Sequence, residues 1–442
     1  MIKVIRIQKK MQVSRLPMKI KTVNMNYADV LSAPKMKHFQ PKKQSMFIRT
    51  LLKAVSVAEL KATHFTYQMT GMDQLSPKEP CLILMNHSSF IDLKIAATIF
   101  YPRPLSIVCT SDGFVGKKNL MRNMGCIPTQ KFVTDLTLVR DMRYAVKKLN
   151  SSILMFPEAS YSFDGTATPL PQSMAKCMKV LGVPVIMVRT NGAFLRDPLY
   201  NNLKKRDVHV SAEVKYLLSP AEIAKKSTEE LNQILSQQFQ FDNFRWQQEH
   251  HIKIDEPFRA DYLNRVLYKC PHCLSEGEMT GMGTKLSCEH CGVTYELTEY
   301  GYLKAIDADT KFDHVPDWYQ WERECVRKEI EEGTYHLETE VDICMMVNMD
   351  CIYHVGKGNL IHTEAGFCLT GCDGAIHYEQ KATVSYSLYA DYYWYEKGDV
   401  ICIGDHDTLY YCFPRNNSDI VAKTRIATEE LYRQKKIILE KQ

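Results

Sequence analysis

His87 and Asp92 have the residue types and the spacing of a general base and the carboxylate that orients it. The apolar run at 81–85 predicts a buried strand before the pair, and residues 93–100 predict a packed helix after it. Asp92 then lies about one helical turn beyond His87, where it can accept a hydrogen bond from the Nδ1–H of the imidazole. That bond leaves Nε2 free as a base and stabilises the imidazolium that forms. The structural alternative is a histidine at a strand end and an aspartate that caps a helix.

Three further blocks follow this pair along the chain. They are 125–131 (Gly-Cys-Ile-Pro-Thr-Gln-Lys), 156–160 (Phe-Pro-Glu-Ala-Ser) and 183–186 (Val-Pro-Val-Ile). In order and spacing the four blocks resemble those of the glycerolipid acyltransferase family, of the type that acylates 1-acylglycerol-3-phosphate. The resemblance covers residues 75–218, roughly a third of the chain. It implies transfer of a fatty acyl group from acyl-CoA or acyl carrier protein to the hydroxyl of a lysophosphatidate-like acceptor, a lysophospholipid, in phospholipid synthesis.

The resemblance also implies roles for single residues. His87 is the catalytic base and Asp92 its orienting partner. The basic residue that closes the second block is usually arginine and binds the acceptor phosphate. Lys131 stands there in this chain, which keeps the charge but loses the bidentate fork. The alternative for Lys131 is a solvated loop lysine.

The third block departs from the family pattern Phe-Pro-Glu-Gly-Thr at two positions. Glu158 matches and, by resemblance, positions the acceptor near His87, while Ser160 keeps the hydroxyl of the usual threonine. Ala159 replaces glycine, and its Cβ disfavours a positive φ. Arg189 follows the fourth block and is expected as a second phosphate contact, with a salt bridge to the fold as the alternative.

Strands and helices alternate around these blocks. The expected strands are 81–85, 105–110, 152–156, 183–188 and 208–217, and the expected helices include 134–150 and 171–181. This order predicts an α/β fold, a mostly parallel sheet flanked by helices, which the resemblance makes glycerol-3-phosphate acyltransferase-like. Ligands bind at the carboxyl ends of the strands in such sheets, where both His87 and Glu158 fall. We expect this acyltransferase domain to span residues 46–260.

Four cysteines form a separate metal pattern, since Cys270-Pro-His-Cys273 is followed fourteen residues later by Cys288-Glu-His-Cys291. Two Cys-x2-Cys pairs at this distance can place four thiolates tetrahedrally around Zn²⁺. We expect a small zinc ribbon at 265–305, with structural zinc because closed four-cysteine sites are usually structural. The odd total of fifteen cysteines favours a reducing compartment.

Charge is distributed unevenly although the net charge is +5. Residues 1–53 hold 13 Lys and Arg against one acidic residue, whereas 338–415 hold 4 against 12 Asp and Glu. The excess of Lys and Arg near the N-terminus predicts a basic, poorly ordered arm at 1–45 that attracts anionic phosphate. A solvated tail is the alternative.

Short alternating stretches separated by glycines predict a C-terminal antiparallel β domain with a terminal helix. With a charged helix before it, this acidic β-rich domain spans 317–440 and resembles a pleckstrin-homology barrel. Its negative charge argues against docking on anionic lipid or nucleic acid. We expect it to bind a partner protein or another part of this chain.

Residues 45–60 predict an amphipathic helix. Its apolar positions recur at three-four spacing: Phe47, Ile48, Leu51, Leu52 and Val55. Such a stripe with basic flanks suits a membrane interface, and packing on the catalytic domain is the alternative. No apolar run approaches the ~20 residues that span a bilayer. We therefore expect a cytoplasmic protein in peripheral contact with the anionic inner face of the cell membrane.

Two other classes of function stay open. One is a zinc-ribbon nucleic-acid-binding protein, which the basic arm supports and the acidic C-terminal part opposes, so nucleic acid is not expected as a partner. The other is a catalytically inactive lipid-binding or regulatory scaffold. Ala159 and Lys131 suggest it, and the intact pair of His87 and Asp92 opposes it.

Overall fold

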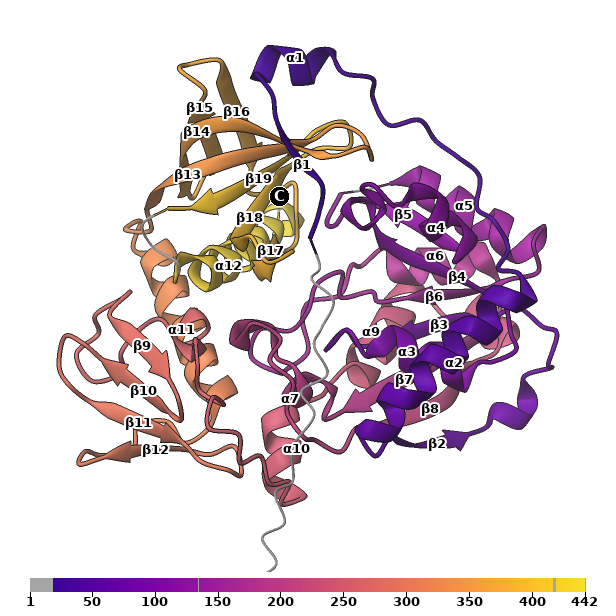
Figure 1. Ribbon diagram of the computed structural model, residues 1–442, viewed down its shortest axis with the longest axis horizontal. Coiled ribbons are helices and arrows are strands. Elements are labelled where there is room, and N and C mark those ends of the chain that lie inside the picture. The colour runs from indigo at the N-terminus through magenta and orange to yellow at the C-terminus, as the bar shows by residue number, and fades with distance from the viewer. Residues whose placement is uncertain (1–18, 134, 416–418, 442) are drawn as a thin grey trace, which may run out of the picture.

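The structure is a computed structural model that describes residues 19–133, 135–415 and 419–441 (Figure 1). Its strands form three sheets, of seven, four and eight strands. Over the described residues, no helix combines the length and the apolarity that crossing a membrane requires.

The seven-stranded sheet and its helices form what we call the α/β unit. The strand order is β2-β8-β7-β3-β6-β4-β5. The strands are β2 (Thr66–Thr70), β3 (Leu82–Met85), β4 (Leu105–Thr110), β5 (Cys126–Thr129), β6 (Ser152–Met155), β7 (Val185–Asn191) and β8 (Ser211–Leu218). Neighbouring strands are parallel, except β7 and β8, which are antiparallel. The predicted α/β fold class with a mostly parallel sheet is confirmed.

Helices cover both faces of this sheet. They are α2 (Met46–Ala62), α3 (Asp92–Ile99), α4 (Lys118–Asn123), α5 (Leu136–Lys147), α6 (Met174–Leu181), α7 (Ala193–Arg196), α8 (Pro220–Lys225), α9 (Thr228–Gln238) and α10 (Asn243–Glu249). Because side chains alternate along a strand, Leu82 and Leu84 of β3 face a core with α5, α6 and α9. Ile83 and Met85 face the other core, with α2 and α3. The central strand is thus buried on both sides, as its unbroken apolar run predicts.

The predicted ribbon is a four-stranded antiparallel sheet in the order β12-β11-β10-β9. Its strands are β9 (Met279–Met282), β10 (Lys285–Cys288), β11 (Thr294–Leu297) and β12 (Leu303–Ile306). Short 3-10 segments occur elsewhere, at Met72–Gln74, Ser111–Phe114, Leu199–Asn201 and Leu263–Arg265.

The eight-stranded sheet, here called the C-terminal sheet, follows helix α11 (Val315–Glu331) and precedes helix α12 (Ile420–Lys441). Its antiparallel part runs in the order β16-β15-β14-β13-β19-β18-β17. The strands are β13 (Leu337–Met346), β14 (Ile352–Thr363), β15 (Gly366–Gly371), β16 (Ile376–Lys381), β17 (Tyr389–Trp394), β18 (Gly398–Gly404) and β19 (Leu409–Pro414). The antiparallel β domain with a terminal helix is confirmed, and its likeness to a pleckstrin-homology barrel stays a prediction.

The eighth strand of this sheet comes from the N-terminal segment. β1 (Thr22–Asn24) pairs in parallel with β14, and α1 (Tyr27–Ser32) buries Val30 before the chain crosses to the α/β unit (Figure 1). The prediction of a poorly ordered arm is wrong for residues 19–45, and residues 1–18 lie outside the described residues. The basic composition of this segment does not reveal the strand, because an edge strand is held by hydrogen bonds of its backbone groups and not by its side chains.

The C-terminal sheet packs against the α/β unit through buried side chains. The ring of Tyr392 on β17 lies 4.5 Å from that of Phe163, centroid to centroid. Arg265, in the 3-10 segment between the α/β unit and the ribbon, forms a 2.9 Å ion pair with Asp399 of β18. One apolar core cluster accordingly contains residues of the α/β unit, the ribbon, α11 and the C-terminal sheet. This packing brings β17 and α12 near the loops that carry the predicted site.

Candidate active site

His87 and Asp92 are joined as their spacing predicts. His87 follows β3 and Asp92 opens α3, and the Nδ1 of His87 lies 3.1 Å from the Oδ2 of Asp92. The same oxygen accepts the backbone N–H groups of Ser88 at 2.8 Å and Ser89 at 3.0 Å. Asp92 is fully buried, so these donors hold the carboxylate in one position. The imidazole is therefore oriented from the Nδ1 side.

The ring of His87 is also held by stacking. Its centroid lies 4.2 Å from that of Phe156 and 4.0 Å from that of Tyr161. No hydrogen bond to Nε2 is recorded among the described residues, and His87 lines a large cavity. A base with its tautomer set by a carboxylate thus faces a space that can hold a substrate.

Glu158 acts on the backbone of His87. One carboxylate oxygen accepts the N–H of His87 at 2.8 Å, and the other accepts the N–H of Thr168 at 2.9 Å. Burial raises the pKa of Glu158 to about 7, although these hydrogen bonds and nearby Arg425 work in the opposite direction. Glu158 is not among the residues that line the cavity. In this structure it positions the base, and the predicted contact with an acceptor stays a prediction.

The residue after Glu158 has a left-handed backbone conformation. Ala159 adopts φ of +57°, although it has the Cβ that glycine lacks. A left-handed conformation costs a residue with a Cβ roughly 1–2 kcal/mol. The surrounding hydrogen bonds hold the loop in this strained form.

The cavity has a volume of about 1660 Å³, more than the ~300–1,000 Å³ of common ligand pockets. Helices α5 and α6 contribute a mainly apolar wall: Leu136, Val139, Met142, Met174, Cys177 and Val180. Strand β17 and helix α12 contribute a polar wall, with Asp391, Arg425 and Glu429. The space therefore combines a surface suited to an acyl chain with a polar region, and both are reached from His87.

Lys131 lines this cavity and is not a solvated loop lysine. Its side chain is only 9% exposed, and its Nζ lies 3.6 Å from the Oδ2 of Asp391 on β17. The same ammonium sits 4.0 Å from the ring centroid of Tyr389, also on β17. The cation that the resemblance assigns to an acceptor phosphate is thus paired with the C-terminal sheet.

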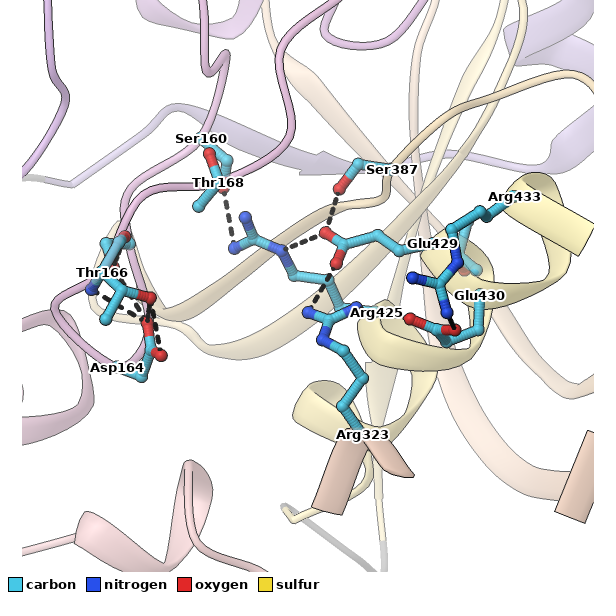
Figure 2. Close-up of polar contacts among 12 residues, drawn as sticks. Ser160, Asp164, Thr166, Thr168, Arg323, Ser387, Arg425, Glu429, Glu430 and Arg433 are labelled. Carbon is cyan, nitrogen blue, oxygen red and sulfur yellow. Dashed lines mark hydrogen bonds and ion pairs between the residues drawn. The ribbon is translucent and has the colours of Figure 1, made fainter. Parts of the chain in front are cut away.

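Ser160 lies behind the cavity wall and accepts a 3.3 Å hydrogen bond from Arg425 of α12. Figure 2 shows Arg425 reaching from α12 toward Ser160, with Glu429 on its other side. Arg425 also donates to the carbonyl of Tyr161 at 3.1 Å. Because the ring of Tyr161 packs on that of His87, α12 supports the loop beside His87.

Arg189 is not brought to the cavity. It lies on β7 and forms a 2.7 Å ion pair with Glu213 of β8. This is the salt bridge that was the alternative to a phosphate contact. The structure therefore brings together His87, Asp92 and Lys131, places Glu158 and Ser160 behind them, and leaves Arg189 on the sheet.

Part of this chain matches a known protein family. Residues 66–190 match the family model named Acyltransferase. The chain carries an acyltransferase-family domain. Among solved structures it is similar to the crystal structure of the 1-acyl-sn-glycerophosphate (LPA) acyltransferase PlsC from Thermotoga maritima. The identity is 18% and the TM-score 0.33, over 44% of this chain and 77% of that one. A search of curated proteins found no match.

Several residues at the cavity of the acyltransferase domain escaped the sequence reasoning. Asp391 and Tyr389 lie on β17, and Arg425 lies on α12, all outside the matched segment. No local motif surrounds them, so only the packing of the C-terminal sheet identifies them. Tyr161, which directly follows the third block, is the exception, because an aromatic residue beside a motif can be suspected of packing on it.

The four ribbon cysteines come together away from the acyltransferase cavity. Cys270 and Cys291 have their sulfurs 3.7 Å apart, as have Cys273 and Cys288. All four sulfurs lie within 4.8 Å of one another. A tetrahedral Zn²⁺ with Zn–S bonds of ~2.3 Å needs sulfurs about 3.8 Å apart, so the donor set fits this metal. None of the four lines the cavity, and a metal held here would shape the ribbon.

Proposed function

We propose that this protein transfers a fatty acyl group from an acyl thioester to the hydroxyl of a lysolipid. The observation that carries the proposal is the oriented His87, whose cavity has an apolar wall and a polar wall. The four motif blocks favour acyl-CoA or acyl carrier protein as donor and lysophosphatidate as the first acceptor to try. Phospholipid synthesis is the process in which such a transfer belongs.

The chemistry needs one base and no covalent enzyme intermediate. The Nε2 of His87 takes the proton of the acceptor hydroxyl while the hydroxyl oxygen bonds to the thioester carbonyl carbon. Asp92 stabilises the imidazolium that results. When the tetrahedral intermediate collapses, the C–S bond breaks and the imidazolium returns the proton to the leaving thiolate. The products are an ester and a free thiol.

We propose that the four-cysteine group holds structural zinc. The metal would fix the two loops of the ribbon, and the cysteines would bind it as thiolates. The fit of the sulfur spacing supports this assignment.

We further propose that α2 attaches the protein peripherally to a membrane, on the cytoplasmic inner face of the cell membrane. Phe47, Leu51 and Val55 lie four residues apart along the helix and are 73%, 48% and 61% exposed. These three side chains are exposed, whereas Ile48 and Leu52 of the same stripe are half-buried, and Arg49 and Lys53 are near the exposed part. An exposed apolar stripe with basic neighbours suits an anionic lipid surface.

The test of the reaction is thiol release by the purified, zinc-replete protein. Each donor is offered with lysophosphatidate and with other lysolipids, and wild type is compared with His87→Ala. A matched control, His377→Ala, removes a histidine that is 66% exposed on the C-terminal sheet. We expect acceptor-dependent turnover that falls about 10²–10⁴-fold in His87→Ala and is unchanged in the control.

Turnover that ignores His87→Ala would show that this histidine is structural and that the proposed reaction is wrong. Wild-type protein that binds lysolipid but turns over none of the acceptors would instead support a lipid-binding scaffold. Neither result is expected, because the described contacts orient the base and leave Nε2 facing the cavity.

A further inference from the structure

The surroundings of Lys131 bear on which acceptor the site selects, an inference that rests on the proposed acyl transfer. Lys131 is the cation that the motif pattern offers to a phosphate. Its ammonium already lies 3.6 Å from the Oδ2 of Asp391 and over the ring of Tyr389. The side chains of Lys131 and Asp391 are 9% and 10% exposed. The two charges of a buried ion pair neutralise each other, because little water screens either charge.

A second buried carboxylate stands in the same region. Asp112 is 3% exposed and accepts hydrogen bonds from the hydroxyl of Tyr389 and from the indole N–H of Trp394, the latter at 3.3 Å. Asp112 and Asp391 both line the cavity, and the Oδ1 of each has no hydrogen-bond partner among the described residues. Burial raises the pKa of Asp391, and the charge of Asp112 adds to that rise while Lys131 opposes it. Lys131 is therefore paired with one of two buried carboxylates that lie in the same region.

This arrangement disfavours a phosphate at Lys131. A phosphate monoester would bring almost two further negative charges to a lysine that a carboxylate already neutralises. Repulsion by Asp391 and Asp112 would offset the attraction to the ammonium. Carboxylate oxygens without partners favour the opposite kind of ligand, one that donates hydrogen bonds. A hydroxyl group does so without adding charge to a buried region.

We propose that the acceptor is an uncharged, hydroxyl-bearing lysolipid such as a monoacylglycerol, and that Asp391 and Asp112 determine this specificity. The free hydroxyl that is acylated lies at His87. A second hydroxyl of the head group donates to the unpartnered carboxylate oxygens near Lys131. The C-terminal sheet thereby converts the phosphate-binding position of the motif pattern into a neutral hydroxyl subsite.

The test compares two acceptors with the same acyl chain, 1-monoacylglycerol and lysophosphatidate, using the full-length protein and one acyl-CoA donor. We expect wild type to prefer the monoacylglycerol at least tenfold in kcat/KM. Asp391→Asn frees Lys131 and should shift the ratio of the two kcat/KM values at least tenfold toward lysophosphatidate. Asp112→Asn should shift it in the same direction, which keeps the test decisive if one variant folds poorly. The control Asp373→Asn, at an exposed position in the turn between β15 and β16, should leave the ratio unchanged.

A wild-type preference for lysophosphatidate would overturn the inference, and so would a ratio that neither aspartate variant changes. Titration calorimetry with glycerol 3-phosphate provides a readout that does not depend on turnover. We expect no binding to wild type and measurable binding to Asp391→Asn; equal binding to both proteins contradicts the proposed subsite. Failure of the proposed reaction looks different, because it abolishes the dependence of thiol release on both acceptors and on His87.

Discussion

Replacing Glu158 by glutamine tests the carboxylate that holds the backbone N–H of His87, the proposed base. Glu158 is 1% exposed, and burial raises its pKa from 4.5 to about 7. The folded protein therefore holds a proton on this group between pH 4.5 and 7, where the unfolded chain has released it. A group of this kind stabilises the fold at low pH, and the stability is lost as the pH rises through the folded-state pKa.

The size of the effect follows from the two pKa values. For a shift of this extent, the contribution of Glu158 to the free energy of unfolding falls by about 2–3 kcal/mol between pH 5 and pH 8. Glutamine has the same shape but does not titrate. The free energy of unfolding of wild type minus that of Glu158→Gln should therefore be about 2–3 kcal/mol greater at pH 5 than at pH 8. Other titrating groups cancel in this difference.

The assay is urea unfolding, followed by circular dichroism at both pH values. The control is Glu249→Gln, at an exposed position at the end of α10, whose difference from wild type should not change with pH. A difference for Glu158→Gln that stays constant, or that grows toward pH 8, would refute the argument that burial disfavours the charge of Glu158. In the thiol-release assay at pH 8 the variant should also be slower, because the amide must turn its NH₂ toward either His87 or Thr168.

Two further predictions concern the ribbon and α2. Cys288→Ser should lose the one zinc expected per chain and expose the ribbon to proteolysis before the rest of the protein; full zinc content in the variant would show that the cysteines do not form a four-ligand site. Leu51→Glu should weaken sedimentation with anionic vesicles at least tenfold, because Leu51 is 48% exposed in the apolar stripe. Its free energy of unfolding should change by no more than about 0.5 kcal/mol. The control Met282→Glu changes a residue that is 74% exposed on the ribbon, and equal loss of vesicle binding in both variants would exclude a specific role for α2.

The parts of the site that the sequence predicts well are local. His87 and Asp92 are separated by one turn from strand to helix, so their hydrogen bond follows from the spacing. The grouping of the ribbon cysteines is also local in part, since each Cys-x2-Cys pair lies within a single loop. The third block predicts the strand end at which Glu158 and Ser160 lie, but not that both are buried behind the cavity wall. A block pattern specifies where a residue lies along a strand, whereas the side that it faces depends on the loop conformation.

The parts that the sequence does not predict depend on contacts between distant segments. Nothing near Asp391 or Arg425 in the chain signals a site, and their roles arise only because the C-terminal sheet packs on the acyltransferase domain. The N-terminal segment shows the same limit. Its basic composition predicted disorder, yet the backbone of β1 pairs with β14 over three residues. Whether the stripe of α2 would be covered was likewise undecided by its periodicity, because burial depends on the neighbours and not on the helix.

The residues at the cavity come from two distant parts of the chain. The proposed base His87, its orienting carboxylate Asp92 and Lys131 all lie within the matched residues 66–190. The group that neutralises Lys131 comes from β17, more than two hundred residues later in the chain. A relative with the same four blocks but without an acidic residue facing Lys131 would keep a free cation and should accept phosphate there. Under the two proposals, the motif blocks supply the reacting groups, whereas the C-terminal sheet that packs on them selects the acceptor.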